Sequence, residues 1–169
     1  NRKNLKRNFR QNVMTIHKIG NLFFVLFCLM SCNSSPEKVE MKNLNGIWDK
    51  KTQQKFDFKI DDAQNPKNII IVVRNNNDYP YSNIRFIVNA TDAQTKKKSV
   101  DTLNYVLAKP NGEWIGKGFG DTKETLFQYK LNYKFPKNGD YSIGIIQAMR
   151  ADQLKGIEDI GLKIETVKP

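Results

Sequence analysis

The cysteines have the most reactive side chains in this sequence. There are two, Cys28 and Cys32, which lie four positions apart near the end of an apolar run. A disulfide between them would have poor geometry in a helical segment and would close almost no loop, so it would add little stability. A zinc site needs four N, S or O ligands, and the only histidine, His17, lies upstream in the same segment. We therefore expect neither a disulfide nor a metal site.

The residues around the cysteines follow the order of a secretory signal peptide. His17 and Lys18 precede an apolar run of about 11 residues, and small or polar residues follow at 31–35. The run is too short for a transmembrane helix, which needs about 20 apolar residues. We predict a cleaved signal peptide over residues 14–31, with residues 1–13 as an upstream extension before Met14.

The residues at the predicted cleavage point, Leu29-Met30-Ser31-Cys32, resemble the lipobox of bacterial lipoproteins. This resemblance implies that Cys32 becomes the first mature residue and carries a diacylglycerol thioether and an acylated amino terminus. Several acyl chains form a durable anchor, whereas one binds a membrane only marginally. Cys32 is the predicted lipidation site, and we expect no cofactor beyond that covalent lipid. Residues 32–43 are predicted to be the lipidated N-terminus and a flexible tether.

Removal of the signal peptide changes the charge of the protein. The whole chain has 28 Lys and Arg against 17 acids, a net charge of +11. Six of the basic residues precede Cys32 and all the acids follow it, so the mature chain carries only +5. A nucleic-acid-binding function inferred from the basic composition would rest on residues that are removed, and we expect no nucleic-acid partner.

Residues 44–169 show the two-residue period of half-buried strands almost throughout. Phe56, Phe58 and Ile60, for example, alternate with charged residues, and turn residues such as Asn, Gly and Pro separate the strand-like segments. Such segments are 56–60, 68–75, 84–91, 99–108, 127–135, 141–150 and 161–167. We predict an all-β fold, an antiparallel β-sandwich of about 7–8 strands, immunoglobulin-like or jelly-roll-like. One helical turn is expected around Ala151 to Asp159.

The mature chain lacks the residues that most catalytic sites require. It has no free thiol and no histidine, which excludes Cys-His and Ser-His arrangements and imidazole metal sites. The carboxylate pairs Asp61-Asp62 and Glu158-Asp159 are adjacent in sequence, so on a strand they point to opposite faces rather than across one cleft. We predict that the protein is not an enzyme and binds no metal.

Two other motifs could suggest a phosphate site. Gly116, Gly118 and Gly120 give a G-x-G-x-G pattern, but the sequence after them is strand-like, whereas a phosphate loop opens a helix. We interpret this segment as a glycine-rich strand or bulged hairpin that allows close backbone approach. The lysines at 96–98 are interpreted as a solvated loop, because a phosphate-binding surface would need a wider cluster interleaved with aromatic residues.

Aromatic residues are the best candidates for binding. Tyr79 and Tyr81 flank Pro80 in a loop between two strong strands, where exposed tyrosines could recognise a protein. Alternatively, the rings of Tyr79 and Tyr81 are both buried and close one end of the sandwich. Trp114 is a further candidate, although it and Trp48 could instead pack in the core or at its rim. Tyr79, Pro80, Tyr81 and Trp114 are the predicted partner-binding residues.

Most of residues 45–165 resembles the GldH family of gliding motility lipoproteins of Bacteroidetes. The segments that carry this resemblance are "NNNDYPYSNIRFIV", "DTLNYVLAKPNGEWIGKGFGD" and "YSIGIIQAMRADQLKGIEDIGLKIE", together with the lipobox. The resemblance implies a cell-envelope lipoprotein needed for the gliding machinery and its associated type IX secretion apparatus, acting beside other gliding lipoproteins. None of these segments is a catalytic motif.

We therefore expect a non-enzymatic binding or assembly component, held at a membrane by acyl chains and contacting other gliding, secretion and envelope proteins. In lipoproteins of this phylum, acidic residues soon after the cysteine resemble a signal for export to the cell surface. The segment "NSSPEKVE" lacks an acidic pair, so the expected location is the outer membrane, on the periplasmic side. The main alternative is a carbohydrate-binding domain with an aromatic platform of Tyr79, Tyr81 and Trp114. A small-ligand carrier would need a sizeable apolar cavity, whereas the alternating pattern favours a filled core.

Overall fold

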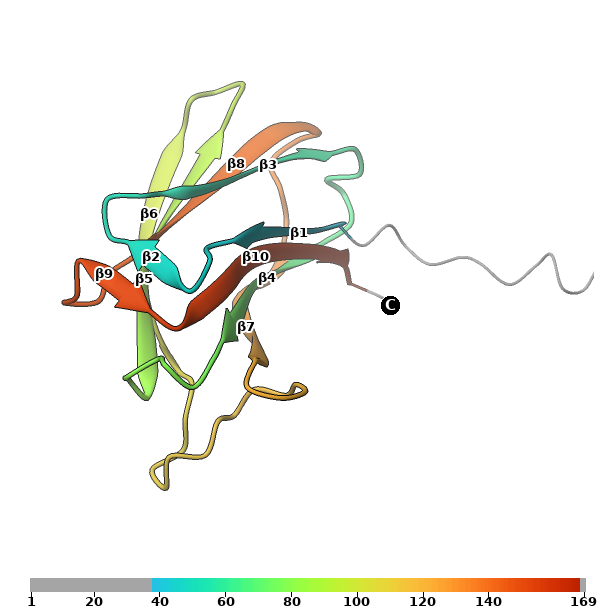
Figure 1. Cartoon of the computed structure of the whole chain (residues 1–169). Coiled ribbons are helices and arrows are strands. Elements are labelled where there is room, and N and C mark those ends of the chain that lie inside the picture. Colours follow the sequence, from blue (N-terminus) through green and yellow to red (C-terminus); the bar gives the residue numbers. More distant parts are fainter. Residues whose placement is uncertain (1–37, 168–169) are drawn as a thin grey trace, which may run out of the picture. The chain divides into compact units, whose positions relative to one another are not determined.

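The computed structural model describes residues 38–167, whose only regular secondary structure is β-strand (Figure 1). The upstream extension, the signal peptide and Cys32 lie outside these described residues. All seven strands predicted from the sequence form, and three shorter ones join them. The strands are β1 (Lys38–Asn43), β2 (Ile47–Asp49), β3 (Gln54–Ile60), β4 (Lys67–Asn75), β5 (Asn83–Asp92), β6 (Lys98–Val106), β7 (Lys123–Tyr133), β8 (Gly139–Gln147), β9 (Gln153–Lys155) and β10 (Ile157–Thr166).

The strand pairing is that of one long hairpin rolled up on itself. β5 pairs with β6, and outward from this hairpin β4 pairs with β7, β3 with β8, β2 with β9 and β1 with β10, all antiparallel. Rolling adds the pairs β4·β10 and β5·β8, which gives two four-stranded sheets, β1-β10-β4-β7 and β3-β8-β5-β6. This is the jelly-roll form of the predicted sandwich, with β2 and β9 as a small accessory sheet.

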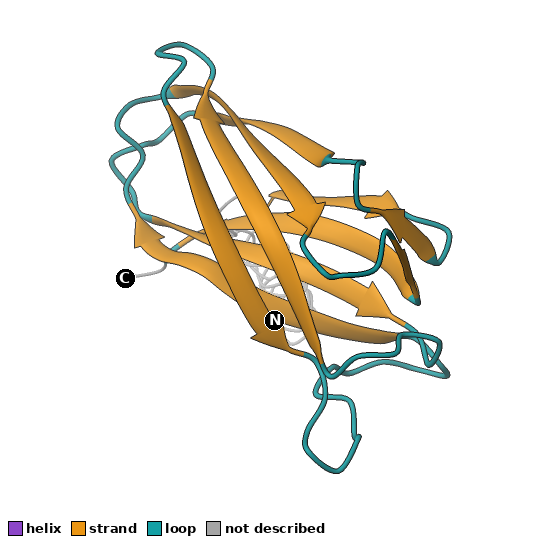
Figure 2. Cartoon of the chain, turned by 90° about the vertical axis from the view of Figure 1, so that its left-hand side faces the viewer, coloured by secondary structure: helices purple, strands orange, loops and turns teal. Residues whose placement is uncertain are grey.

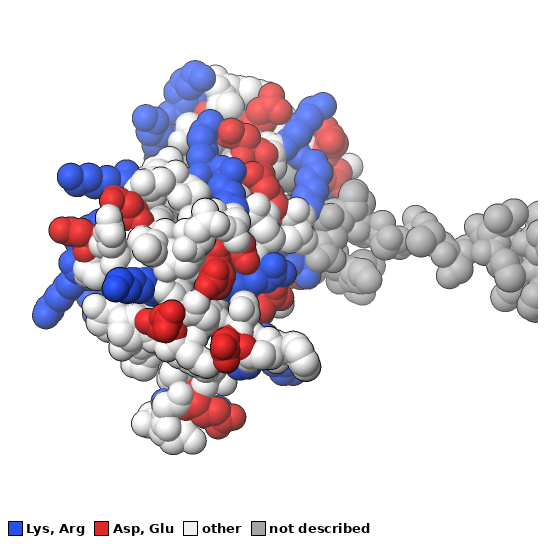
Figure 3. Space-filling view, viewed as in Figure 1, with Lys and Arg blue, Asp and Glu red and all other residues white. Residues whose placement is uncertain are grey.

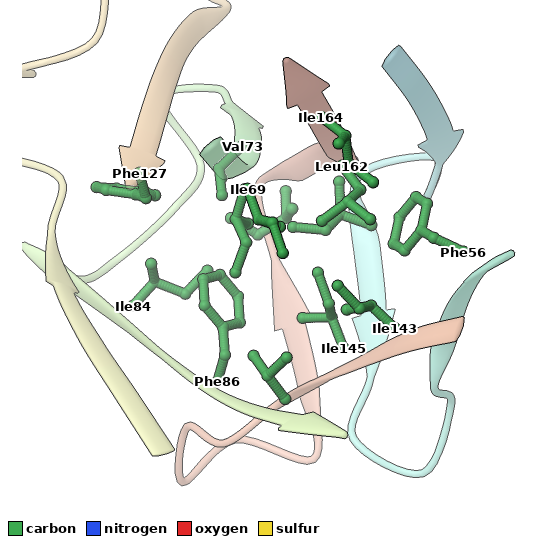
Figure 4. Close-up of a cluster of buried hydrophobic side chains, with 14 of the residues drawn as sticks. Phe56, Ile69, Val73, Ile84, Phe86, Phe127, Ile143, Ile145, Leu162 and Ile164 are labelled. Atoms are coloured by element: carbon green, nitrogen blue, oxygen red, sulfur yellow. The ribbon is translucent and has the colours of Figure 1, made fainter. Parts of the chain in front are cut away.

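The two four-stranded sheets lie face to face as separate layers, with loops gathered at both ends of the strands (Figure 2). Ile69 and Val73 of β4 point toward the other sheet, where Phe86 of β5 and Ile145 of β8 meet them (Figure 4). Successive side chains along a strand point alternately into this core and away from it, which explains the two-residue period of the sequence.

The ends of the sandwich differ in what they carry. We call proximal the end where the chain enters β1 at Lys38; it also holds the loops 61–66, 93–97 and 134–138. We call distal the opposite end, with the loops 76–82 and 107–122 and the turn at Gly156. β10 runs from the distal end to the proximal end over ten residues, so the two ends lie about 30 Å apart.

The helical turn predicted around Ala151 to Asp159 is wrong, because this segment forms β9 and the start of β10. Leu154 and Ile157 have no exposed surface, and Leu154 lies opposite Trp48 in the pairing of β2 with β9. Gly156 separates the two strands with a φ of +78°, a conformation that breaks the strand without starting a helix. The burial of Leu154 and Ile157 against residues distant in the sequence therefore favours strands over a helical turn in this segment.

The predicted boundary between tether and domain also moves. β1 covers residues 38–43, which the sequence assigned to the tether, and it pairs with β10 along its whole length. Its burial is low because it is the edge strand of its sheet, so its sequence shows little alternation. Residues 38–43, which the sequence assigned to the tether, are thus part of the folded domain.

Candidate functional site

One carboxylate of each adjacent pair noted in the sequence is held by a neighbouring side chain. Within residues 38–167, no three His, Cys, Asp or Glu side chains gather closely enough to hold a metal ion. Asp62 lies 2.6 Å from the buried ammonium of Lys67, which holds the pKa of this carboxyl below its usual range. Asp159 accepts a hydrogen bond from Asn43 at 2.9 Å. Arg74 lies between Asp159, at 3.6 Å, and Glu124, at 2.7 Å, so these two carboxylates share one cation.

The distal end brings together the four residues predicted to bind a partner, but only some of them are accessible. Tyr79 is 3% exposed, and its hydroxyl donates a hydrogen bond to the carbonyl of Asn83 at 2.7 Å. Burial raises the pKa of the Tyr79 hydroxyl, which keeps it protonated for this bond. Tyr79 thus closes the end of the sandwich, as one alternative expected of both rings, whereas Tyr81 remains exposed.

Tyr81 and Pro80 lie on the solvent side of the same loop. Tyr81 is 38% exposed, and its ring meets the Tyr79 ring edge to face at a centroid distance of 5.8 Å. Pro80 between them is exposed. The buried Tyr79 ring therefore supports the exposed Tyr81 ring from behind, which limits its freedom without hiding it.

Trp114 joins the cluster from the loop between β6 and β7. Its ring centroid lies 6.4 Å from that of Tyr79, and its indole N–H donates to Asn77 at 3.1 Å. Asn77 in turn donates to Asp121 at 3.1 Å. The half-buried Trp114 thus ties the 107–122 loop to the 76–82 loop, so these two loops form one surface. Tyr79, Tyr81 and Trp114 do not form an open aromatic platform, because only Tyr81 presents a ring freely.

The glycine-rich segment is a short hairpin, as its strand-like context predicted. Lys117 and Glu124 exchange two backbone hydrogen bonds, at 2.9 and 2.8 Å. A Cβ built on Gly118 would overlap the backbone carbonyl oxygen of Thr122, and one on Gly116 would lie 2.8 Å from the carbonyl oxygen of Glu124. The glycines are therefore needed for close backbone approach and have no phosphate-loop geometry.

The hairpin carries the most exposed apolar residue of the described domain, which sequence reasoning missed. Phe119 is fully exposed, between Gly118 and Gly120. Ile115, on the same loop, is 46% exposed. The glycines on either side of Phe119 have no side chains against which its ring could pack. This pattern in the sequence could have indicated that Phe119 is exposed. We call Tyr81, Trp114, Ile115 and Phe119, which all lie on the two loops of the distal end, the distal apolar surface.

Charged residues surround this surface without forming a field of one sign. Lys and Arg are interspersed with Asp and Glu on the face shown in Figure 3. Lys109 pairs with Glu113 at 2.9 Å on the loop that bears Trp114. The side-chain hydrogen bond and ion pair with Glu124 raise the pKa of Arg74 beside the hairpin. Such a surface suits a protein contact better than a polyanion.

Comparison with known proteins gives the family. The sequence model described as "GldH lipoprotein" matches residues 38–164. A "Gliding motility lipoprotein GldH homolog" of Christiangramia forsetii is 39% identical over 149 residues, which cover 84% of this chain and 91% of that protein. The "Gliding motility lipoprotein GldH" of Flavobacterium johnsoniae is 34% identical over 159 residues, covering 90% of this chain and 98% of that protein.

Among solved structures, one of infectious bursal disease virus Gx strain aligns with a TM-score of 0.35 and 14% identity. It covers 79% of this chain and 33% of the viral chain, a likeness too low to bear on the fold. No helix within residues 38–167 has the length and apolar character needed to cross a membrane. The family match spans nearly all the described residues, and on these sequence comparisons the chain belongs to the GldH lipoprotein family.

Proposed function

We propose that this protein is a lipid-anchored, non-enzymatic assembly component of the gliding motility machinery. Two related proteins, 39% and 34% identical, are named as gliding motility lipoproteins, and each matches most of this chain. Cys32 holds the protein at the outer membrane, on the periplasmic side, and the distal apolar surface binds another protein of the gliding or associated type IX secretion apparatus.

The fully exposed ring of Phe119 is the observation that carries this proposal. Exposing a phenylalanine to water is unfavourable by about 1.5–3 kcal/mol relative to burying it, so a partner gains that amount by covering it. Aromatic residues in turn dominate binding energy at protein interfaces. The Trp114 indole N–H already donates to Asn77 within the domain, so covering it leaves no unsatisfied donor there.

The proposal is tested by exchanging exposed apolar residues at one end only. In the Tyr81→Ser/Phe119→Ser variant, neither side chain contributes to the core, so the fold should persist while the partner is lost. Val100→Ser/Leu131→Ser is the matched control, because these residues are 65% and 49% exposed and lie away from the distal end. Partners are recovered from crosslinked envelopes through an affinity tag, and gliding is scored on the same cells.

We expect the distal variant to lose both its co-purified proteins and gliding, while the control retains both. Equal recovery of partners from the two variants would refute the assignment of the distal surface. The anchor is tested separately with Cys32→Ala. A Cys32→Ala protein that stays fully functional as a monomer free of the membrane would refute the anchoring role. The platform of Tyr79, Tyr81 and Trp114 that the carbohydrate-binding alternative requires is not open, because Tyr79 is buried.

A further inference from the structure

A cleft opens between the two sheets at the proximal end, where the alternating sequence pattern predicted a filled core. Its volume is about 250 Å³, and it lies between the end of β7, the start of β6 and the strands β3, β5 and β8. Phe135 and Tyr141 form its wall, with ring centroids 4.7 Å apart. The aromatic residues that line it are Phe58, Tyr129, Tyr133, Phe135 and Tyr141.

Lysines surround the mouth of this cleft. Lys97, Lys98 and Lys130 line it, and Lys96, Lys134 and Lys137 lie in the two loops beside it. Lys130 sits over the rings of Tyr129 and Tyr133, at 5.0 and 5.4 Å from their centroids. The acidic residues on the same strands and loops are fewer: Asp92, Asp101 and Asp140. Asp61 and Asp62 lie in the loop that contacts Asn138, and they pair with Lys59 and Lys67.

Most of these ammonium groups have no carboxylate to neutralise them. Lys130 lies 3.2 Å from Asp101, and Asp92 is occupied by the turn, where it accepts backbone hydrogen bonds from Gln94 and Thr95. Within residues 38–167, no ion pair involves Lys96, Lys97, Lys98 or Lys134. The lysines at 96–98 are therefore part of the wider cluster, interleaved with aromatic rings, that an anionic ligand needs.

The cleft lies at the end of the domain where the chain leads back to the anchor. Lys38 begins β1 at this end, and its ammonium donates to the carbonyl of Lys59 at 2.7 Å. Since β1 starts at Lys38, five residues separate it from Cys32, and the six residue-to-residue steps span only about 20 Å even when fully extended. An anchor on Cys32 therefore keeps the proximal end close to the lipid headgroups.

We propose that the proximal end contacts the membrane through this cleft, with the lysines holding the phosphate of an anionic phospholipid headgroup. The aromatic rings pack against the glycerol and first acyl carbons of the same lipid, as tyrosines do at membrane interfaces. This inference rests on the proposed lipid anchor at Cys32. Its consequence is orientation, because a domain seated on its proximal end projects the distal apolar surface about 30 Å away from the bilayer.

The test is lysine footprinting of the lipidated full chain in vesicles. The protein is reconstituted into phosphatidylcholine vesicles with or without phosphatidylglycerol, lysines are acylated with a water-soluble ester, and modification is read by mass spectrometry. We expect phosphatidylglycerol to slow the acylation of Lys97, Lys98 and Lys134 by about fivefold, the factor for one lysine at an anionic surface. Lys50, Lys51 and Lys155, at the distal end, are internal controls whose rates should not change.

Two matched variants separate a specific contact from general attraction. Lys97→Gln/Lys98→Gln/Lys134→Gln should abolish the remaining protection at Lys96 and Lys137. Lys50→Gln/Lys51→Gln/Lys155→Gln removes the same charge at the other end and should leave the protection intact. If both variants lose protection equally, net charge and not the cleft is responsible, and the proposal fails.

Other outcomes identify what would replace the proposal. Equal acylation in both kinds of vesicle, with the protein still attached, overturns the headgroup contact alone. Protein that detaches from both kinds of vesicle overturns the anchor on Cys32 instead. Protection by inorganic phosphate in neutral vesicles, as strong as that by phosphatidylglycerol, would indicate a free-anion site. Protection by a soluble oligoglutamate peptide only would indicate an acidic protein segment, and either result contradicts the membrane contact.

Discussion

Gly156 is the residue where a single added methyl group should damage the fold and the distal surface together. It lies in the turn between β9 and β10 with a φ of +78°. A Cβ built on it would overlap the backbone nitrogen of Tyr79 and lie 2.5 Å from the Tyr79 Cα and 2.7 Å from the Asp78 carbonyl carbon. All these atoms are backbone, so the 76–82 loop itself would have to move. We predict that Gly156→Ala is strongly destabilising.

The expected size of the effect has two parts. A left-handed conformation costs a residue with a side chain about 1–2 kcal/mol. Steric overlap with packed neighbours costs about 1–3 kcal/mol more. The free energy of unfolding should therefore fall by about 2–5 kcal/mol. With a urea dependence of about 2 kcal/mol per molar, the unfolding midpoint should fall by about 1–2.5 M.

Gly112→Ala is the matched control for this prediction. Gly112 has a similar φ of +86°, but nothing lies within 4 Å of a Cβ built on it. It should therefore lose only the conformational part, about 1–2 kcal/mol. Urea unfolding followed by tryptophan fluorescence gives both values. Equal losses for the two variants would show that the 76–82 loop does not press on Gly156, which would contradict the structure of the distal end.

Two further predictions concern the accessory sheet and the β6–β7 side of the sandwich. Leu154→Ala should lower the free energy of unfolding by about 2–5 kcal/mol, because Leu154 is fully buried opposite Trp48, whereas Ile47→Ala at a 49% exposed position of the same small sheet should change it far less. Tyr129→Phe should alter the pH dependence of stability. The Tyr129 hydroxyl donates a hydrogen bond to Asp101 at 2.5 Å, and this bond is the main reason why the pKa of Asp101 lies below its usual range. The ionised Asp101 therefore stabilises the folded state above about pH 4. That stabilisation is lost as the pH falls through the folded-state pKa. Urea unfolding between pH 3 and 6 should show a shallower acid loss in the variant, and an unchanged slope would contradict this role of the hydroxyl.

The fold class was predictable because its determinants are local. The β-branched run of β4 and the alternation of Phe56, Phe58 and Ile60 specify strands whatever their partners are. The choice between an immunoglobulin-like and a jelly-roll-like sandwich was not predictable, since both have short strands at similar spacing. That choice lies in pairings such as β1 with β10, which join residues more than 100 positions apart.

Parts of the candidate site depend on equally distant contacts. Tyr79 and Tyr81 are equivalent in sequence, one on each side of Pro80, and the close approach of Gly156 accompanies the burial of Tyr79 alone. In the sequence, the lysines at 96–98 indicate only a solvated loop. The structure places Lys97 and Lys98 around the same cleft as Tyr129 and Tyr133, which lie more than 30 positions away in the sequence. Phe119 is different, because its position between two glycines was visible in the sequence and only its significance was missed.

Photocrosslinking from position 119 in living cells tests the central claim most directly. A photoreactive phenylalanine analogue replaces Phe119 in one strain and Leu131 in another, since both residues are exposed but only Phe119 belongs to the distal apolar surface. Our account predicts that position 119 forms a discrete adduct with another protein of the cell envelope, that position 131 does not, and that the adduct disappears when Tyr81→Ser is added. The absence of an adduct from position 119, or the same adduct from both positions, would contradict the claim that this lipoprotein binds its partner through the distal end.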